Sequence, residues 1–271
     1  MTFAPEWLAL RERADAEARA ADLLDPLRET LGRAPAVIGM NRTPLVVRDL
    51  GCGTGSMGRW LTGRLDGPQH WVLHDRDPRL LALAGAAMTR EEGVTVETRQ
   101  GDLTALRADD LAGTSLVTAS ALLDLLTADE VAGLAEACVG AGCPALLTLS
   151  VAGRVELDPA EALDAEFTAA FNAHQRRTDD GRRLLGPDAV EVTAAAFQAL
   201  GAAVITRSSP WRLGPGDAAL TGEWLRGWVG AACEQEPHLA AEAPAYLERR
   251  LAGDLGAVVH HTDLLALPGA A

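Results

Sequence analysis

The chain of 271 residues contains no lysine, so all 24 of its basic side chains are arginine. Aromatic residues make up only 4%. No uncharged run suits a transmembrane helix, which needs ~20 mostly apolar residues; the longest, Ala137–Gly153, is interrupted by Pro144. The four cysteines lack the paired spacing that is typical of zinc sites or disulfide frameworks. We therefore expect no membrane span, no metal site and no disulfide scaffold.

Negative charge dominates the sequence, with 38 acidic residues and a net charge of −14. Such a surface repels nucleic-acid phosphates and anionic lipids. The N-terminal residues lack the basic segment and apolar run of a secretion signal. A hydrophobic fraction of 48% is enough to form a core. The composition indicates a soluble, cytoplasmic, acidic protein without nucleic-acid or membrane partners, and leaves open whether it is a monomer or a homodimer.

Short apolar runs alternate with helical patterns in the first half of the chain. Strands are predicted at Leu45–Leu50, Trp71–His74, Val94–Thr98, Leu116–Ala119 and Ala145–Val151. Helices are predicted near Met57–Leu65, Arg79–Thr89 and Ala128–Val139. This alternation indicates βαβ units and a parallel sheet that is covered on both faces. With the later strands included, we predict an α/β fold: a Rossmann-like, doubly wound, mostly parallel sheet of seven strands.

The flanking regions are expected to close over this core. An N-terminal helix is predicted over Pro5–Leu31. After Val151 the pattern predicts four helices, near Pro159–Phe171, Asp188–Leu200, Asp217–Glu234 and Leu239–Ala252, and two strands, at Ala202–Thr206 and Ala257–Ala266. We therefore expect one catalytic domain in three parts: an N-terminal helical cap over residues 1–40, a cofactor-binding core over 41–151, and a lid with the remaining strands over 152–271.

A glycine-rich loop follows the first predicted strand and precedes a helix, with the sequence Asp49-Leu50-Gly51-Cys52-Gly53-Thr54-Gly55. Gly53, Gly55 and Gly58 also have the G-x-G-x-x-G spacing of a dinucleotide site, and Asp75 lies 20 residues beyond Gly55, where an acid binds ribose hydroxyls. Two cofactor classes therefore compete, a nicotinamide or flavin dinucleotide and S-adenosylmethionine.

Charge separates the two classes. A pyrophosphate binds at helix N-terminal amides and is disfavoured by an adjacent carboxylate, yet Asp49 stands two residues before the first glycine. That position suits the ammonium and sulfonium of S-adenosylmethionine. Asp102 follows the third strand, where its side chain is suited to accept a hydrogen bond from the adenine amino group. Three acids just past neighbouring strand ends favour S-adenosylmethionine.

On these residues, the span 45–150 resembles the core of class I S-adenosylmethionine-dependent methyltransferases. Their acid-x-Gly-x-Gly-x-Gly motif is matched from Asp49 to Gly55, and residues 116–124 are similar to their fourth-strand motif beside the methyl donor. The resemblance implies S-adenosylmethionine as cofactor and S-adenosylhomocysteine as product. It implies these cofactor-binding residues: Asp49, Gly51, Gly53, Gly55, Asp75, Arg76, Asp102, Leu103 and Ser120.

The sequence departs from the family pattern at Arg48, a charged residue inside the first strand that must reach a partner or a sheet edge. The Asp/Asn-Pro-Pro-aromatic motif of methyltransferases that act on nucleic-acid bases is absent. Together with the net charge of −14, this argues against a nucleic-acid substrate and favours a small molecule.

Candidates for the acceptor site come from several segments. His174, in the polar segment after the fifth strand, is the candidate general base, because histidine titrates near neutral pH. Arg176 is assigned with it to the acceptor site. The alternative is a solvated loop in which these side chains pair with Asp179 and Asp180.

The N-terminal helix repeats Trp7, Arg11, Asp15 and Arg19 at four-residue intervals. By resemblance, such a helix closes over the cofactor, so that Trp7 and Arg11 are expected to line the pocket. Arg11, Asp15 and Arg19 fit a surface salt-bridge ladder equally well.

Trp211, in a predicted loop, is a candidate for contacting an aromatic or cationic acceptor. Asp124, from the fourth-strand motif, completes the candidate set for acceptor binding. We predict a methyltransferase that acts on a small molecule at an oxygen, nitrogen or carbon atom. The alternatives are an NAD(P)-dependent oxidoreductase, a non-catalytic S-adenosylmethionine-binding protein and, with support only from an arginine cluster at 176–183, an RNA methyltransferase.

Overall fold

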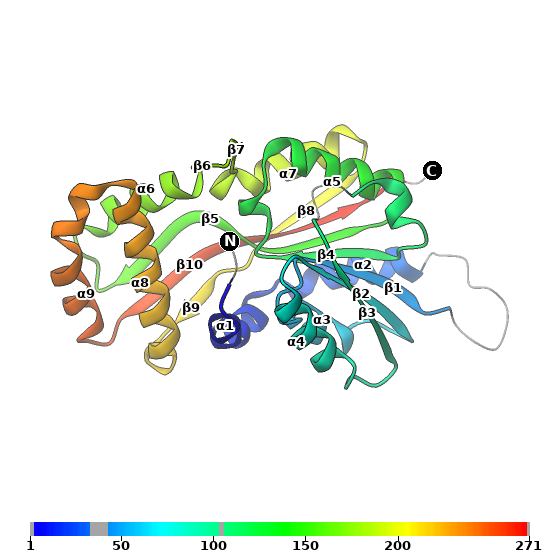
Figure 1. The fold of residues 1–271 in the computed structure, drawn as a ribbon, viewed down its shortest axis with the longest axis horizontal. Helices are drawn as coiled ribbons and strands as arrows, with labels where there is room; N and C mark the ends of the chain where they lie inside the picture. Colours follow the sequence, from blue (N-terminus) through cyan, green and yellow to red (C-terminus); the bar gives the residue numbers. More distant parts are fainter. Residues whose placement is uncertain (1–2, 33–42, 103–105, 270–271) are drawn as a thin grey trace.

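The computed structural model describes residues 3–32, 43–102 and 106–269. The strands of its main sheet are β1 (Leu45–Leu50), β2 (Gln69–Asp75), β3 (Val94–Gln100), β4 (Leu116–Ser120), β5 (Ala145–Asp158), β8 (Ala203–Ser208), β9 (Trp211–Leu213) and β10 (Gly256–Leu267). Seven of them follow the order β3-β2-β1-β4-β5-β10-β8, and β9 pairs with β10 beside this path (Figure 1). The first five strands are parallel and β10 is antiparallel to its neighbours. The Rossmann-like, mostly parallel seven-stranded sheet is confirmed.

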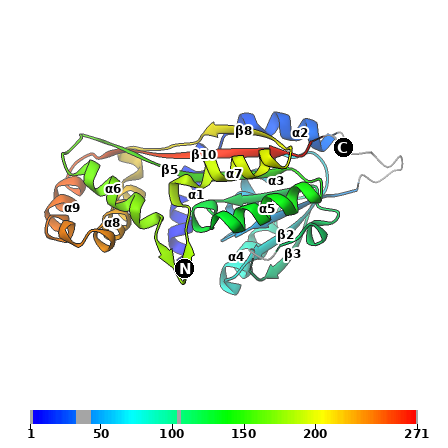
Figure 2. The same cartoon turned by 90° about the horizontal axis from the view of Figure 1, so that it is seen from above.

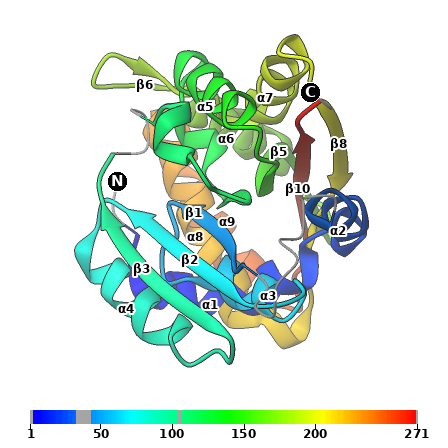
Figure 3. The same ribbon diagram turned by 90° about the vertical axis from the view of Figure 1, so that its right-hand side faces the viewer.

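Helices cover both faces of this sheet. Their bounds are α1 (Pro5–Ala18), α2 (Leu24–Gly32), α3 (Ser56–Thr62), α4 (Pro78–Met88), α5 (Ala128–Gly140), α6 (Asp164–Gln175), α7 (Ala189–Ala199), α8 (Ala218–Gln235) and α9 (Ala243–Leu251). One core packs α5 and α7 on β4, β5 and β10, and a second packs α2, α3 and α4 on the opposite face (Figure 3). This is the doubly wound arrangement that the strand–helix alternation predicts.

Shorter elements connect the larger ones. A two-stranded ribbon is formed by β6 (Thr178–Asp179) and β7 (Arg182–Arg183). The 3-10 helices are η1 (Ala21–Leu23), η3 (Ala108–Leu111), η4 (Leu123–Leu125), η5 (Gly186–Asp188), η6 (Pro215–Asp217) and η7 (Pro237–Ala241). Among the helices of the described residues, none is long and apolar enough to cross a membrane.

Strand β5 extends seven residues beyond the predicted end at Val151, whereas β10 matches its predicted span to within one residue at each end. The register of pairing between β5 and β10 shifts twice. The shift between Thr262 and Leu264 of β10 places Thr148 and Leu149 of β5 opposite the single residue Asp263. Such a bulge bends the strand and increases its twist. Beyond the shifts the two strands continue as a ribbon with β9, and α6, α8 and α9 gather on it at one end of the molecule (Figure 2). A third core forms there, with Phe167, Trp228 and Tyr246 buried in it.

The predicted single helix over Pro5–Leu31 is divided in two. The backbone leaves helical geometry at Arg19 and Ala20, and η1 then leads into α2. Neither proline nor glycine marks this break. The Ala20 N–H donates instead to the carboxylate of Asp263, at 2.8 Å. Asp263 is a buried residue of β10. A tertiary hydrogen bond therefore takes up a backbone donor that a continuous helix would use internally.

Candidate functional site

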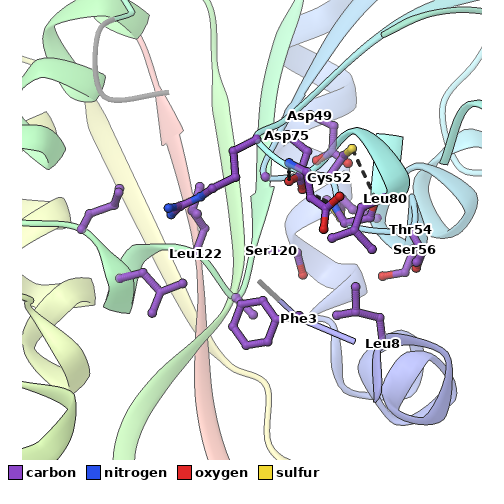
Figure 4. Close-up of a pocket in the computed structure, with 18 of the residues that line it drawn as sticks. Phe3, Leu8, Asp49, Cys52, Thr54, Ser56, Asp75, Leu80, Ser120 and Leu122 are labelled. Atoms are coloured by element: carbon purple, nitrogen blue, oxygen red, sulfur yellow. Dashed lines mark hydrogen bonds between the residues drawn. The ribbon is translucent and has the colours of Figure 1, made fainter. Parts of the chain in front are cut away.

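A cavity of about 460 Å³ opens at the carboxyl ends of β1, β2 and β4. One side is formed by the glycine loop and acids; residues there include Asp49, Gly51, Gly53, Asp75, Arg76 and Asp102. The rest of the lining combines apolar residues, namely Phe3, Leu8, Leu122, Leu125 and Leu126, with the charged residues Arg11, Asp15, Glu130 and Arg182. Figure 4 shows Phe3 and Leu8 at the N-terminal side of the cavity, and the Leu8 side chain lies close to the glycine loop, 3.2 Å from where a Cβ at Gly53 would be. Helix α1 thus forms one wall of the cavity beside the loop.

The glycine loop needs residues without a side chain. Gly51, Gly53 and Gly55 all have positive φ values, of 64°, 55° and 86°. This left-handed region disfavours residues with a Cβ atom. The Asp75 carboxylate holds the loop in place, because its two oxygens accept hydrogen bonds from the backbone N–H groups of Gly53 and Asp77, each at 2.9 Å.

Asp49 lies beneath the loop and is 1% exposed. One carboxylate oxygen accepts a hydrogen bond from the Thr118 hydroxyl at 2.8 Å. The other has no hydrogen-bond partner among the described residues, although it is buried at the cavity. Burial raises the pKa of Asp49 to about 7, against the opposing effects of Thr118 and Arg19. An unpaired buried carboxylate is costly, so this oxygen is suited to a cationic ligand group.

Arg19 is the most informative residue that sequence reasoning left aside. Its guanidinium is buried and donates to the hydroxyls of Ser56 and Ser120, at 3.1 and 3.2 Å, both of which line the cavity. Its Nε and Nη1 have no partner among the described residues. Burial lowers the pKa of Arg19, while Asp15 is the strongest of the nearby carboxylates that oppose this shift. The only sequence signal was its place on the four-residue stripe.

The interpretation of the residues at four-residue intervals as a surface salt-bridge ladder is wrong for Asp15 and Arg19. Both side chains are buried, at 5% and 4% exposed. Asp15 receives two hydrogen bonds from Arg11, at 2.9 and 3.2 Å, and a third from the Trp211 indole at 3.0 Å. The Arg11 guanidinium lies 5.1 Å from the centre of the Trp211 ring. Arg11 therefore lines the cavity as a cation that is already held in position.

Trp211 does not occupy an exposed loop, and that expectation is wrong. It begins β9, is 3% exposed and packs edge-on against Trp7, with the ring centres 6.4 Å apart. Neither tryptophan belongs to the cavity lining. Proline and arginine beside Trp211 suggested a loop, but pairing of β9 with β10 and the hydrogen bond to Asp15 bury the indole.

The structure also places His174 and Arg176 away from the cavity lining. His174 lies in the last turn of α6, and its Nε2 is 3.1 Å from a carboxylate oxygen of Glu234 on α8. Arg176 donates twice to Asp188, at 2.6 Å. Their partners are thus neither Asp179 nor Asp180. The placement of His174 beside α8 corrects the expectation that it faces the acceptor, because α6 packs on α8 rather than over the cavity.

Of the other residues singled out from the sequence, Ser120 lines the cavity and Gly55 lies just behind it at the start of α3. Asp124 is not in the lining, but its chain neighbours Leu122 and Leu125 are. Leu103 lies outside the described residues.

The charged residue inside the first strand finds one partner in the neighbouring strand β2 and one in the loop before β4. The Arg48 side chain donates to the Thr114 hydroxyl at 2.9 Å and approaches His74 Nε2 at 3.2 Å. Burial, together with Arg48, lowers the pKa of His74 to about 4. His74 is therefore neutral at physiological pH, which allows its ring nitrogen to accept a hydrogen bond from Arg48. Arg48 therefore reaches buried partners, one of the two outcomes that its place inside the first strand allowed.

The fold and the cavity together define a class of proteins. Strand order, glycine loop and acids at three strand ends have the arrangement of a nucleotide-binding α/β sheet, in which ligands bind at the carboxyl ends of the strands. Residues 47–141 match the family model described as a methyltransferase domain. The chain therefore carries a methyltransferase domain over these residues, about a third of its length.

Solved structures share this fold at low sequence identity. The YcgJ protein of Bacillus subtilis is 16% identical, with a TM-score of 0.50 over 91% of this chain and 99% of that chain. A S-adenosylmethionine-dependent methyltransferase from Thiobacillus denitrificans, solved with S-adenosylhomocysteine, is also 16% identical, with a TM-score of 0.46 over 98% of this chain and 100% of that chain. No relative was found among curated proteins.

Proposed function

We propose that the protein transfers the methyl group of S-adenosylmethionine to a small-molecule acceptor. The observation that carries this proposal is the cavity of about 460 Å³ that the glycine loop and its neighbouring acids line, together with leucine side chains and Phe3. Its volume lies within the usual range for small-molecule sites, ~300–1,000 Å³. The net charge of −14 further disfavours a nucleic-acid substrate.

The polar groups at the cavity fit both ends of this cofactor. We assign the free oxygen of Asp49 to the ammonium of the methionine part. Arg19 is not in the lining but donates to Ser56 and Ser120, which are, and we assign its free Nε and Nη1 to the carboxylate of the methionine part. Asp75 and Asp102 are assigned to the ribose and the adenine, as the family resemblance implies. The methionine part is a zwitterion with one ammonium and one carboxylate. Binding it would give the buried charges of Asp49 and Arg19 the partners that their free atoms lack in the unliganded protein.

The chain's contribution to the reaction is orientation and exclusion of water. S-adenosylmethionine supplies a methyl group activated by the sulfonium. Phe3 and Leu8 cover the cavity from the α1 side, and Leu122 and Leu125 form an apolar wall beside the strand ends. When the methyl donor and the acceptor are bound in line, their translational and rotational entropy has already been lost on binding. The barrier to methyl transfer is lower because this entropy does not have to be lost at the transition state.

Calorimetry should show S-adenosylhomocysteine binding in the micromolar range, about −8 kcal/mol. NAD should bind far more weakly, because its pyrophosphate would meet the buried carboxylate of Asp49. Tight NAD binding without a heat signal from S-adenosylhomocysteine would contradict the proposed function and favour the oxidoreductase alternative.

The affinity for S-adenosylhomocysteine should depend on pH through Asp49. Because the pKa of Asp49 is about 7, the carboxyl must release a proton at lower pH before it can bind an ammonium. Affinity should therefore fall as pH decreases from 7 to 5, by up to about tenfold per pH unit. Titrations across this range test the effect. Asp49→Asn should bind weakly with a flat pH profile, and a flat profile in the unmodified protein would contradict the assignment.

A further inference from the structure

Two arginines of the cavity lining are each paired with a carboxylate that also lines the cavity. Arg11 donates to Asp15 through Nε and Nη2, at 2.9 and 3.2 Å. Arg182 donates to Glu130 through the corresponding atoms, at 2.9 and 2.7 Å. In both arginines the other terminal nitrogen, Nη1, has no hydrogen-bond partner among the described residues. The lining therefore contains guanidinium donors that the protein itself does not use.

The two pairs lie in different parts of the cavity. The hydrogen bond to Glu130 raises the pKa of Arg182, and Asp102, the acid assigned to the adenine, adds to this shift. Burial raises the pKa of Asp124, whereas a backbone hydrogen bond and the charge of Arg11 oppose that shift. Such charge effects require proximity. Because the turn that holds Asp124 supplies leucine side chains to the lining, Arg11 lies on the side that the cofactor assignments leave free.

The guanidinium of Arg11 is held in one orientation. Its carbon lies 5.1 Å from the centre of the Trp211 ring and 6.0 Å from that of Trp7. Asp15 is buried and accepts a further hydrogen bond from the Trp211 indole, at 3.0 Å. An arginine that is fixed in this way loses little side-chain entropy when it binds a ligand. Since the Asp15 oxygens already have three donors, this pair presents donors rather than acceptors to the cavity.

We propose that the methyl acceptor carries a carboxylate on an apolar body, and that Nη1 of Arg11 binds this carboxylate. The inference rests on the proposed function and names the substrate class of the same cavity. Guanidinium and carboxylate groups form charge-assisted hydrogen bonds, which are about twice as strong as neutral ones. Phe3 and the leucines of the turn after β4 supply apolar surface for the rest of the molecule.

Charge limits the acceptor to a single negative charge. The charged residues of the lining are the acids Asp15, Asp49, Asp75, Asp77, Asp102 and Glu130 and the arginines Arg11, Arg76 and Arg182. A dianion such as a phosphate ester would meet this surplus of carboxylates. A cationic acceptor would bring a second positive charge to the sulfonium and leave Nη1 of Arg11 unpaired. Because Asp15 balances the charge of Arg11, recognition depends on the directed N–H groups.

Four ligands that share one ring test the inference: benzoate, benzyl alcohol, benzylamine and phenyl phosphate. Each is titrated into protein saturated with S-adenosylhomocysteine, and binding is followed by ligand-observed NMR. Benzoate should bind at least about tenfold more tightly than the other three, because it alone gives the fixed donors a single negative charge. The same preference should hold for 2-naphthoate over 2-naphthalenemethanol, which extends the test to a larger apolar body.

Variants of α1 assign the preference to Arg11. Arg11→Gln should weaken benzoate binding by about tenfold to a hundredfold, the effect of losing a charge-assisted hydrogen bond. Its Kd for S-adenosylhomocysteine should stay within about threefold, since the methionine carboxylate is assigned to Arg19. Arg11→Lys should recover only part of the loss, because one ammonium must serve both Asp15 and the ligand. The matched control is Arg13→Gln, which removes an exposed arginine from the same helix and should change neither affinity.

The ligand comparison uses the unmodified protein, so it stands even where a variant fails to fold. Carboxylates that bind no better than the alcohols overturn the inference, as does tighter binding of the amine or the phosphate. Unchanged benzoate affinity in folded Arg11→Gln also overturns it. Loss of S-adenosylhomocysteine binding in folded Arg11→Gln would place Arg11 in the cofactor site instead. Failure of the unmodified protein to bind S-adenosylhomocysteine would refute the proposed function itself.

Discussion

Replacing Asp263 with alanine should lower the free energy of unfolding by about 4 kcal/mol, because several buried donors lose their acceptor together. Asp263 is 0% exposed and accepts hydrogen bonds from the Leu149 N–H at 2.7 Å, the Ala20 N–H at 2.8 Å and the Ser209 hydroxyl at 2.5 Å. These donors belong to the β5 bulge, the break after α1 and the segment before β9. For a chain of this length, the melting temperature should fall by roughly 10 °C.

The asparagine variant is the graded control for Asp263. Asp263→Asn keeps one acceptor oxygen but points an N–H₂ group at a backbone donor, so its melting temperature should lie between those of the alanine variant and the original. Thermal and urea unfolding of all three proteins measure the difference. If Asp263→Ala melts within about 2 °C of the original protein, the carboxylate does not hold these segments together.

Asp75→Ala should weaken the binding of S-adenosylhomocysteine by at least tenfold to a hundredfold, because charge-assisted hydrogen bonds contribute ~1.5–3 kcal/mol each. The variant removes the assigned partner of the ribose hydroxyls. It also releases the Gly53 and Asp77 N–H groups, which now shape the glycine loop and the start of α4. Isothermal titration gives the affinity, and circular dichroism shows whether the variant is folded.

Asp66→Ala is the matched control, since it removes an acid that is exposed in the turn before β2. Its affinity for S-adenosylhomocysteine should equal that of the original protein, which separates the local role of Asp75 from the loss of one negative charge. Unchanged affinity in a folded Asp75→Ala protein would show that neither the ribose assignment nor the support of the loop by Asp75 is correct.

That the glycine loop and the acids Asp49 and Asp75 line one cavity could be predicted, because the signals are local in the sequence. Gly51, Gly53 and Gly55 are needed wherever a strand turns into a helix through positive φ values. Asp49 and Asp75 stand at the ends of adjacent parallel strands, so that strand prediction alone brings them to one edge of the sheet. Once the two strands are predicted to be parallel neighbours, Asp49 and Asp75 must lie close together at the carboxyl edge of the sheet. No contact between distant parts of the chain is needed for this prediction.

The acceptor side could not be predicted in the same way. His174 and Trp211 were chosen for their chemistry, but helix packing places His174 beside Glu234, and strand pairing buries Trp211 against Asp15. Arg19 was assigned to a surface ladder, yet it reaches two serine hydroxyls at the cavity. Each outcome depends on a partner that is 37 to 196 residues away in the chain.

The sequence by itself determined the α/β class, the order of strands and helices, the glycine loop and the family of cofactor. These follow from hydrophobic periodicity and from residues within one strand–turn–helix unit. Only the tertiary structure decided where α1 ends, how far β5 extends, and which side chains from outside the glycine loop line the cavity. The physical reason is that buried polar groups must find partners. Asp263 accepts hydrogen bonds from the Ala20 N–H in the break after α1 and from the Leu149 N–H at the bulge in β5, and these segments meet only in the folded chain.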